Sequence, residues 1–316
     1  MCAASRDSLF KKLTQAGPAE RPFVFLKRAR YSGDPFGAYQ NSAGEDPGVL
    51  LESSRTSQKT GRYSLIGVCP SFIFSAKAGQ ITLTCGGHSE TRVGDPLEIL
   101  RRIFGKFQLP AEPGFPPFTG GAMGYFSYEA KNLIEPRLPR TAVDDVGLPD
   151  IYLLFFESGL VVDHEKKESW IFLYQWSPGG RKPSPASVAR RFESLERLFS
   201  GPPKGPRTPA RRHPRTAVSM PRVQCSLDRE GFMEKVEVAK EYIRRGDIFQ
   251  ANLSQRLSFK LGKDAFDIYR KLRRINPSPF FGFLQGEGFQ VISGSPERLV
   301  KLENRVLETR PIAGTR

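Results

Sequence analysis

The sequence predicts an α+β fold, in which antiparallel strands and helices pack around a shared core. Short runs rich in β-forming residues are separated by tight turns, which favours hairpins. Other stretches repeat apolar residues at every third or fourth position, which predicts helices with one buried face. With 316 residues and 39% hydrophobic content, the chain is long enough to bury a substantial core.

The first predicted elements are a hairpin and a helix. Residues 72–74 and 81–84 are β-rich and are separated by an Ala-Gly turn. Asp95 and Pro96 then supply an N-cap and a first-turn proline for a helix. Its apolar residues follow at helical spacing and are Ile99, Leu100, Ile103, Phe104 and Phe107. This helix therefore has one apolar face to bury.

Two longer β-rich runs come next. Residues 151–161 and 170–176 are joined by the charged turn 163–168, which predicts an antiparallel pair. Such a pair implies a sheet that is covered on one face.

The main domain boundary is predicted in a segment of unusual composition. Residues 177–223 are rich in Pro, Gly, Ser and Arg and contain one short helical candidate at 186–199. We interpret this segment as a linker. It separates an N-terminal domain at 1–176 from the first part of a second domain at 224–316.

The second domain starts with a helix that Asp228 or Ser226 can cap and that Gly246 ends. A strand is predicted at 249–259. A second helix at 265–275 ends before an Asn-Pro pair, because the residue before a proline is pushed out of the helical region. Three short strands complete the prediction, at 280–284, 289–293 and 299–302.

The cysteines and the apolar segments limit the class of protein. The four cysteines form no CxxC pair and have no histidine cluster near them, which argues against a zinc site and a disulfide framework. Reduced thiols predict a cytoplasmic location. The opening residues lack the apolar core of a secretory signal, and the most apolar stretch, 151–162, is short and interrupted by Glu157. We therefore predict no membrane span.

The net charge of +15 and the pI near 9.8 raise nucleic-acid binding as a candidate. The proline-rich segment 201–223 holds six of the basic residues and no acidic residue, namely Lys204, Arg207, Arg211, Arg212, Arg215 and Arg222. No aromatic residue lies between these arginines, so a base-stacking surface is not indicated. We interpret the segment as a solvated linker and predict no nucleic-acid partner.

Several short strings are specific enough to compare with known families. In the second domain they are GDIFQANLSQR at 246–256, NPSP at 276–279, SPER at 295–298 and RPIAGTR at 310–316. In the first domain they are LLES at 50–53, GRYS at 61–64, GGAMGYFSY at 120–128 and LPD at 148–150. Together they resemble the chorismate-utilising enzymes, the family of anthranilate synthase component I and aminodeoxychorismate synthase component I, over nearly the whole chain.

The resemblance implies two packed antiparallel β-sheets flanked by helices, with a fold that is incomplete at the C-terminus. The chain stops at its PIAGT motif, and the magnesium-binding glutamates and most chorismate contacts of the family are expected beyond residue 316. No metal ligand is therefore predicted within the chain, although the full-length enzyme is expected to use Mg²⁺. We expect the 316-residue chain to be inactive by itself and to expose apolar surface at an open sheet edge.

The resemblance also assigns a catalytic residue and two substrate contacts. Glu297 of the SPER string corresponds to a proton donor, and a carboxyl group can fill that role if burial raises its pKa. Without the resemblance, a surface or salt-bridged glutamate beside Arg298 is the more common interpretation. By resemblance Gly314 and Thr315 contact chorismate, through an unobstructed backbone N–H and a hydroxyl. Ala313 stands where some relatives carry a nucleophilic lysine, so no covalent adduct forms there.

A second predicted site binds tryptophan, which in the family is either a feedback inhibitor or a buried structural ligand. The residues that match its binding positions are Ser53, Arg62, Tyr63, Pro279, Phe280 and Phe281. Anthranilate synthases usually have Tyr-Met in place of Phe280 and Phe281, which argues against a responsive inhibitor site. Without the resemblance, both phenylalanines are core residues.

The predicted function is aminodeoxychorismate synthase component I, which replaces the 4-hydroxyl of chorismate with an amine for folate synthesis. Its ammonia comes from a glutamine amidotransferase partner or from solution. Asn252, the string at 124–128 with the pairs at 134–135 and 138–139 that follow it, and the string at 279–284 resemble this branch. Ala313 favours the alternative, anthranilate synthase component I. A second alternative is a non-catalytic fragment that binds tryptophan or the partner. A nucleic-acid-binding protein ranks last.

Overall fold

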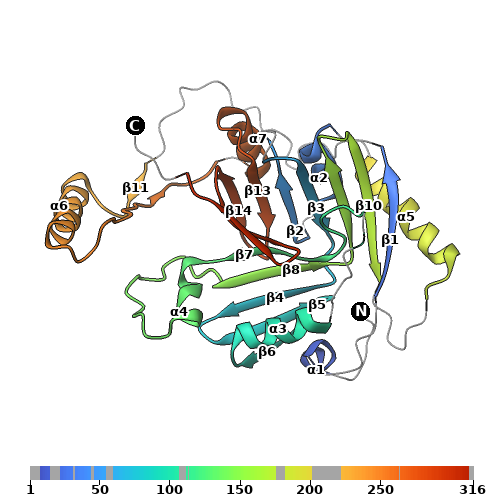
Figure 1. The fold of residues 1–316 in the computed structure, drawn as a ribbon, viewed down its shortest axis with the longest axis horizontal. Coiled ribbons are helices and arrows are strands. Elements are labelled where there is room, and N and C mark those ends of the chain that lie inside the picture. Colours follow the sequence, from blue (N-terminus) through green and yellow to red (C-terminus); the bar gives the residue numbers. More distant parts are fainter. Residues whose placement is uncertain are drawn as a thin grey trace. The chain divides into compact units, whose positions relative to one another are not determined.

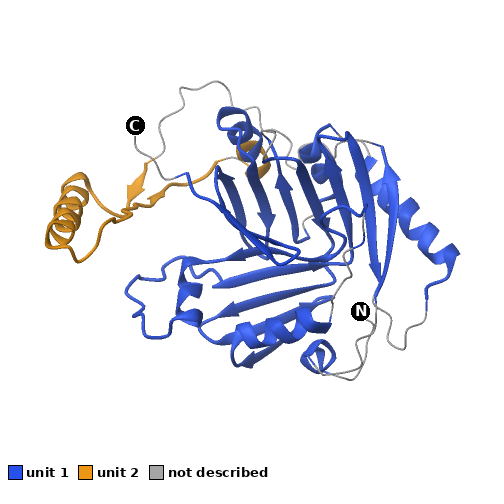
Figure 2. Cartoon of the chain, in the orientation of Figure 1, with its two compact units in different colours: residues 1–205, 269–316 blue, residues 206–268 orange. Residues whose placement is uncertain are grey.

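The computed structural model describes most of the chain. The described residues are 8–14, 22–30, 33–43, 46–54, 60–106, 112, 114–175, 182–200, 222–262 and 264–312. The chain divides into two compact units, residues 1–205 with 269–316 and residues 206–268 (Figure 2). The smaller unit contains helix α6 (Arg229–Arg245) and a short antiparallel ladder of β11 (Gln224–Cys225) and β12 (Leu257–Ser258).

The larger unit is built on two antiparallel sheets (Figure 1). Seven strands form the first sheet in the order β1 (Phe23–Ala29), β10 (Glu168–Gln175), β9 (Ser158–Asp163), β3 (Tyr63–Val68), β2 (Gly48–Glu52), β13 (Phe280–Gln285) and β14 (Gln290–Ser295). Five strands form the second in the order β6 (His88–Val93), β5 (Gln80–Cys85), β4 (Phe72–Lys77), β8 (Ile151–Phe156) and β7 (Gly121–Phe126). The predicted α+β class with two packed antiparallel sheets is confirmed.

Helices and one hairpin complete the fold. The helices are α1 (Leu9–Thr14), α2 (Pro35–Ser42), α3 (Pro96–Lys106), the 3-10 turn η1 (Tyr128–Ala130), α4 (Lys131–Ile134), α5 (Pro185–Ser200) and α7 (Ala265–Ile275). The hairpin pairs β15 (Arg298–Glu303) with β16 (Val306–Arg310). Helices α1 and α3 lie against the outer face of the five-stranded sheet (Figure 1).

The seven-stranded sheet takes strands from both sides of the predicted domain boundary. Strand β13 pairs with β2, with Phe281 opposite Glu52, although 229 residues separate the two positions (281 − 52). Residues of the predicted domains 1–176 and 224–316 thus share one sheet. The helix predicted at 186–199 is present as α5 inside the segment 177–223.

The run 151–161 is two strands, and the prediction of a single strand was wrong. Strand β8 ends at Phe156 and belongs to the five-stranded sheet, whereas β9 begins at Ser158 and belongs to the other. Glu157 lies at the break between them. The expected antiparallel pair does form between β9 and β10, with Asp163 opposite Glu168.

Strand β8 is buried at every residue, so the expectation of a sheet covered on one face is also corrected. Alternate side chains point to opposite faces of a strand. Tyr152, Leu154 and Phe156 pack between the two sheets, in one cluster with Val49 of β2. Leu153 and its alternate neighbours pack against the cluster that includes α1 and α3. The strand therefore has core on both faces.

Close contact between the sheets requires a glycine at position 67 in β3. A Cβ atom there would lie 2.5 Å from the methyl group of Met123 and 2.7 Å from the ring of Phe156. Real Cβ atoms do not approach other atoms so closely. Gly67 thus lets the apolar residues of β7 and β8 reach the backbone of β3.

The other local predictions have mixed outcomes. The hairpin of β4 and β5 and the helices α3, α6 and α7 are confirmed. Asp228 caps α6 by accepting the backbone N–H of Gly231 at 2.8 Å, and Gly246 ends the helix with φ of 77°. Of the strand predicted at 249–259, only the two residues of β12 are a strand. Among the described residues they pair with β11, which is also two residues long. No described helix has the length and apolar character needed to cross a bilayer.

The cap of α3 gives a first testable prediction. The Asp95 carboxylate accepts the backbone N–H of Leu97 at 2.8 Å. Replacing Asp95 with alanine leaves this N–H without its side-chain acceptor, so we expect the free energy of unfolding to fall by about 1 kcal/mol. Urea denaturation measures the change. Asp95→Asn keeps an acceptor oxygen at the cap and should behave like the wild type; equal losses in both variants would contradict the cap.

Candidate functional site

A cavity of about 1390 Å³ opens in the larger unit, with walls formed by β2, β3, β13 and the ends of neighbouring strands. The six residues predicted to bind tryptophan all line it, namely Ser53, Arg62, Tyr63, Pro279, Phe280 and Phe281. They come from three separate parts of the sequence, which the sheet brings together. Their role in binding stays a prediction.

Hydrogen bonds fix the position of Ser53 at the end of β2. Its hydroxyl donates to the carbonyl of Tyr63 at 2.7 Å and lies 3.4 Å from the carbonyl of Pro279. The next residue, Ser54, is bonded reciprocally to Ser278: each backbone N–H donates to the other residue, at 3.1 and 2.9 Å. The LLES and NPSP strings therefore form one continuous wall of the cavity.

The guanidinium group of Arg62 is already engaged by the protein. It donates to both carboxylate oxygens of Asp163, with Nη2 to Oδ2 at 2.8 Å, and lies 3.2 Å from Glu165. Burial alone would raise the pKa of Asp163, but the bonds from Arg62 and from the backbone of Lys166 outweigh it, so the pKa lies below its ordinary value. The guanidinium also stacks over the ring of Tyr63, 4.8 Å from its centroid.

The Asp163 pair gives a second prediction, for acid stability. Because the folded-state pKa of Asp163 is lowered, its contribution is present above the unfolded pKa near 3.8 and is lost as the pH falls through the folded pKa. Asp163→Asn should therefore lower the free energy of unfolding at neutral pH by about 1.5–3 kcal/mol. Urea denaturation across the acid range should show the wild-type and variant curves converging. A constant difference down to the lowest pH would contradict this assignment.

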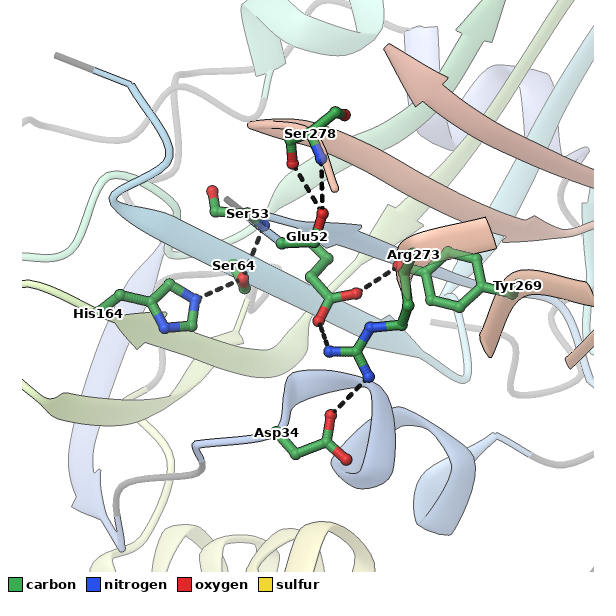
Figure 3. A network of polar contacts seen from close by, with 9 residues as sticks. Asp34, Glu52, Ser53, Ser64, His164, Tyr269, Arg273 and Ser278 are labelled. Carbon is green, nitrogen blue, oxygen red and sulfur yellow. Dashed lines mark hydrogen bonds and ion pairs between the residues drawn. The ribbon is translucent and has the colours of Figure 1, made fainter. Parts of the chain in front are cut away.

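A second polar group is centred on Glu52 of the cavity lining and joins β2 to α7 (Figure 3). The buried carboxylate of Glu52 accepts the hydroxyl of Tyr269 at 2.7 Å and forms an ion pair with Arg273. Arg273 also pairs with Asp34 at 2.9 Å. Burial raises the pKa of Glu52, although Tyr269 and Arg273 oppose the rise. These bonds hold α7 against the sheet.

The predicted catalytic residue, Glu297, is not among the residues that line the cavity. Glu297 is exposed between β14 and β15, and its carboxylate accepts the backbone N–H of Ile312 at 3.2 Å. The burial that would suit it as a proton donor is not supplied by the described residues. Gly314 and Thr315 lie outside the described residues, as does Ala313.

Sequence reasoning missed several residues of the site. His164 lines the cavity and its Nε2 lies 2.8 Å from the hydroxyl of Ser64, which in turn accepts the backbone N–H of Ser53 at 3.0 Å. Ser64 stands in the GRYS string, which was a signal. Tyr269 and Arg273 carried only a weak signal, their spacing of four on the predicted helix.

Comparison with known proteins identifies the family. Residues 46–316 match the family model described as chorismate binding enzyme. The chain belongs to this family. It is 37% identical to anthranilate synthase component 1 of Acetivibrio thermocellus over 84% of this chain and 54% of that protein. It is also 37% identical to aminodeoxychorismate synthase component 1 of Bacillus subtilis, over 85% of this chain and 54% of that protein.

A third relative and one solved structure agree with this membership. Anthranilate synthase component 1 of Thermus thermophilus is 40% identical over 89% of this chain and 57% of its own length. The crystal structure of anthranilate synthase component I from Streptococcus pneumoniae aligns with a TM-score of 0.59 at 29% identity, over 80% of this chain and 54% of that chain. The chain thus spans about half the length of the relatives that it matches.

Proposed function

We propose that the protein is component I of an aminodeoxychorismate synthase, acting in the cytoplasm. Its substrate is chorismate, and its ammonia is supplied by a glutamine amidotransferase partner. Membership of the chorismate-binding family supports the substrate class. The observation that supports the finer assignment is the Phe280-Phe281 pair in the lining of the cavity, where anthranilate synthases usually have Tyr-Met.

The proposed reaction exchanges one substituent on the ring. In the product the nitrogen of ammonia is bonded to the ring carbon C4, and the 4-hydroxyl leaves as water. Chorismate thereby becomes 4-amino-4-deoxychorismate. Glu297 is proposed to give the departing hydroxyl its proton. Ala313 has no lone pair, so ammonia adds without a covalent enzyme intermediate. Gly314 and Thr315 are proposed to hold a carboxylate of the substrate.

The family resemblance also implies Mg²⁺ in the complete enzyme. No group of three His, Cys, Asp or Glu side chains that could hold an ion occurs among the residues that the structure describes. These residues do not fit a magnesium site, and none of them is assigned to the ion.

The product of the reaction tests the proposal. The purified chain and a longer protein that contains it should be incubated side by side with chorismate, Mg²⁺ and ammonia. Aminodeoxychorismate, identified by mass, is the expected product. Anthranilate and released pyruvate would instead support the alternative of anthranilate synthase component I, which several relatives favour by name.

Tryptophan is the proposed ligand of the cavity around Ser53. The test is the melting temperature of the chain with increasing tryptophan, because a ligand that binds only the folded state raises it. Ser53→Ala removes the hydroxyl at the wall and should reduce the effect. Tryptophan-dependent stabilisation of a protein that forms neither product would favour a non-catalytic binding role.

A further inference from the structure

The serine hydroxyls of the cavity wall at the end of β2 donate to the protein backbone. Ser53 donates to the carbonyl of Tyr63 at 2.7 Å. Ser54 donates to the carbonyl of Ser278 at 2.9 Å, and Ser278 donates to that of Ser295 at 2.7 Å. A carbonyl oxygen only accepts, and a serine hydroxyl has a single proton, so the direction of these bonds is fixed. Toward a ligand, the hydroxyl oxygen of Ser53 is therefore an acceptor.

The backbone N–H groups of the same wall are engaged as well. The N–H of Ser53 donates to the hydroxyl oxygen of Ser64 at 3.0 Å (Figure 3). Ser54 and Ser278 donate their N–H groups to each other, at 3.1 and 2.9 Å. The carbonyl oxygen of Pro279, 3.4 Å from the hydroxyl of Ser53, adds another acceptor. This wall thus offers a ligand lone pairs rather than N–H or O–H groups.

The charges of the cavity lining are balanced and paired. Among the described residues that line the cavity, three are basic and three are acidic, although the chain carries a net charge of +15. Each basic side chain has an acidic partner: Asp163 at 2.8 Å from Arg62, Glu308 at 2.6 Å from Arg298, and Glu303 at 2.5 Å from Lys301. A carboxylate that enters the cavity therefore meets cations that are already neutralised.

We propose that the cavity recognises its ligand through an ammonium group, held by the acceptor oxygens beside Ser53, and disfavours ligands of net negative charge. An ammonium group has three donors and no acceptor, so it complements a wall of lone pairs. A carboxylate has acceptors alone and complements neither this wall nor the paired cations. The phenylalanine and aliphatic side chains of the lining suit an apolar ring. The ligand class is thus an aromatic amine or a zwitterionic aromatic amino acid; the inference rests on the proposed function only for the indole ring.

Three compounds with the same ring test this recognition. Tryptophan carries both charged groups, tryptamine lacks the carboxylate, and indole-3-propionate lacks the amino group. Titration calorimetry of the full chain at about pH 7, where an aliphatic amine is charged, measures their dissociation constants. We expect indole-3-propionate to bind about ten- to hundredfold more weakly than tryptophan, the range for lost hydrogen bonds to a charged group. Tryptamine should stay within about fivefold of tryptophan, because its carboxylate-free side makes no unsatisfied cation.

A variant of Ser53 locates the ammonium group. Ser53→Ala removes an acceptor oxygen and should weaken tryptamine about tenfold, while competition experiments should show indole-3-propionate unchanged. A serine that only supports the wall would weaken both compounds alike, so equal losses would contradict the proposal. Ser89→Ala, on the exposed strand β6, is the matched control and should bind all three compounds as the wild type does.

The outcomes separate the mode of recognition from the proposed ligand. If tryptamine binds and tryptophan does not, the proposed ligand is wrong and the ammonium recognition stands. If indole-3-propionate binds as tightly as tryptophan, the ammonium recognition is refuted and the ligand stands. If none of the three compounds binds, both are refuted, whereas the reaction with chorismate is decided separately by its product.

Discussion

Arg273→Met should lower the free energy of unfolding by about 3–5 kcal/mol at neutral pH, the cost of leaving a buried charge without its partner. The side chain of Glu52 is only 1% exposed, so water cannot replace the guanidinium group. The hydroxyl of Tyr269 remains as a single donor. Urea denaturation monitored by circular dichroism measures the loss.

The pH dependence identifies the cause of this loss. The folded-state pKa of Glu52 is raised by burial, and removing Arg273 takes away one of the groups that oppose the rise. Below the unfolded pKa near 4.5, Glu52 is protonated in both the folded and the unfolded state and does not destabilise the fold. As the pH rises through the raised folded pKa, the buried group becomes charged and the free energy of unfolding falls. The deficit of Arg273→Met should therefore shrink in acid. The double variant Glu52→Gln/Arg273→Met should recover part of the stability at neutral pH.

A surface pair serves as the control. Arg101 and Glu98 form an ion pair along α3, in which the arginine side chain is 78% exposed. Arg101→Met should change the free energy of unfolding by less than about 1 kcal/mol. Similar losses in Arg101→Met and Arg273→Met would show that the buried pair contributes no more to stability than an exposed pair.

Phe281→Ala should lower the free energy of unfolding by about 3–5 kcal/mol, as expected for removing a fully buried ring. The ring packs edge-on against Tyr269 with centroids 5.0 Å apart. It also covers Gly294 on the neighbouring strand, where a Cβ atom would lie 2.9 Å from it. Truncation therefore leaves a hole between β13, β14 and α7 that rigid neighbours cannot fill.

The adjacent residue is the matched control for Phe281. Phe280 lies on the opposite face of β13 and is half-buried, with the guanidinium group of Arg298 over its ring at 5.5 Å. Phe280→Ala should lower the free energy of unfolding by at most about half as much. The ring is only half-buried, so its removal exposes less apolar surface to water. Thermal and urea denaturation of both variants decide the point. A larger loss in Phe280→Ala would mean that the assignment of the core face is wrong.

Elements with local signals could be predicted from the sequence. Caps, apolar spacing and a following Gly or Asn-Pro predict the helices α3, α6 and α7, and all of these signals lie within a few residues of one another. Glu157 is the one charged residue that interrupts the apolar run where β8 ends and β9 begins. A run that is apolar on both faces carries no period, so the two strands looked like one.

Long-range pairing could not be predicted in this way. Nothing in residues 48–52 indicates that β2 will pair with β13, since both are short apolar strands that many partners would suit. The cavity residues were found because their strings resemble a family. Glu52, Tyr269 and Arg273 meet only through the tertiary fold, as do Ser64 and His164.

The pairing of β2 with β13 has a consequence for the order in which the chain folds. During synthesis, β2 emerges more than two hundred residues before β13, so one edge of the sheet stays unpaired while the intervening segments are made. Closing so long a loop costs entropy before any contact repays it, which slows folding. The exposed edge of a nascent sheet can pair with other chains. Yield of folded protein should therefore depend on how quickly residues 280–295 become available.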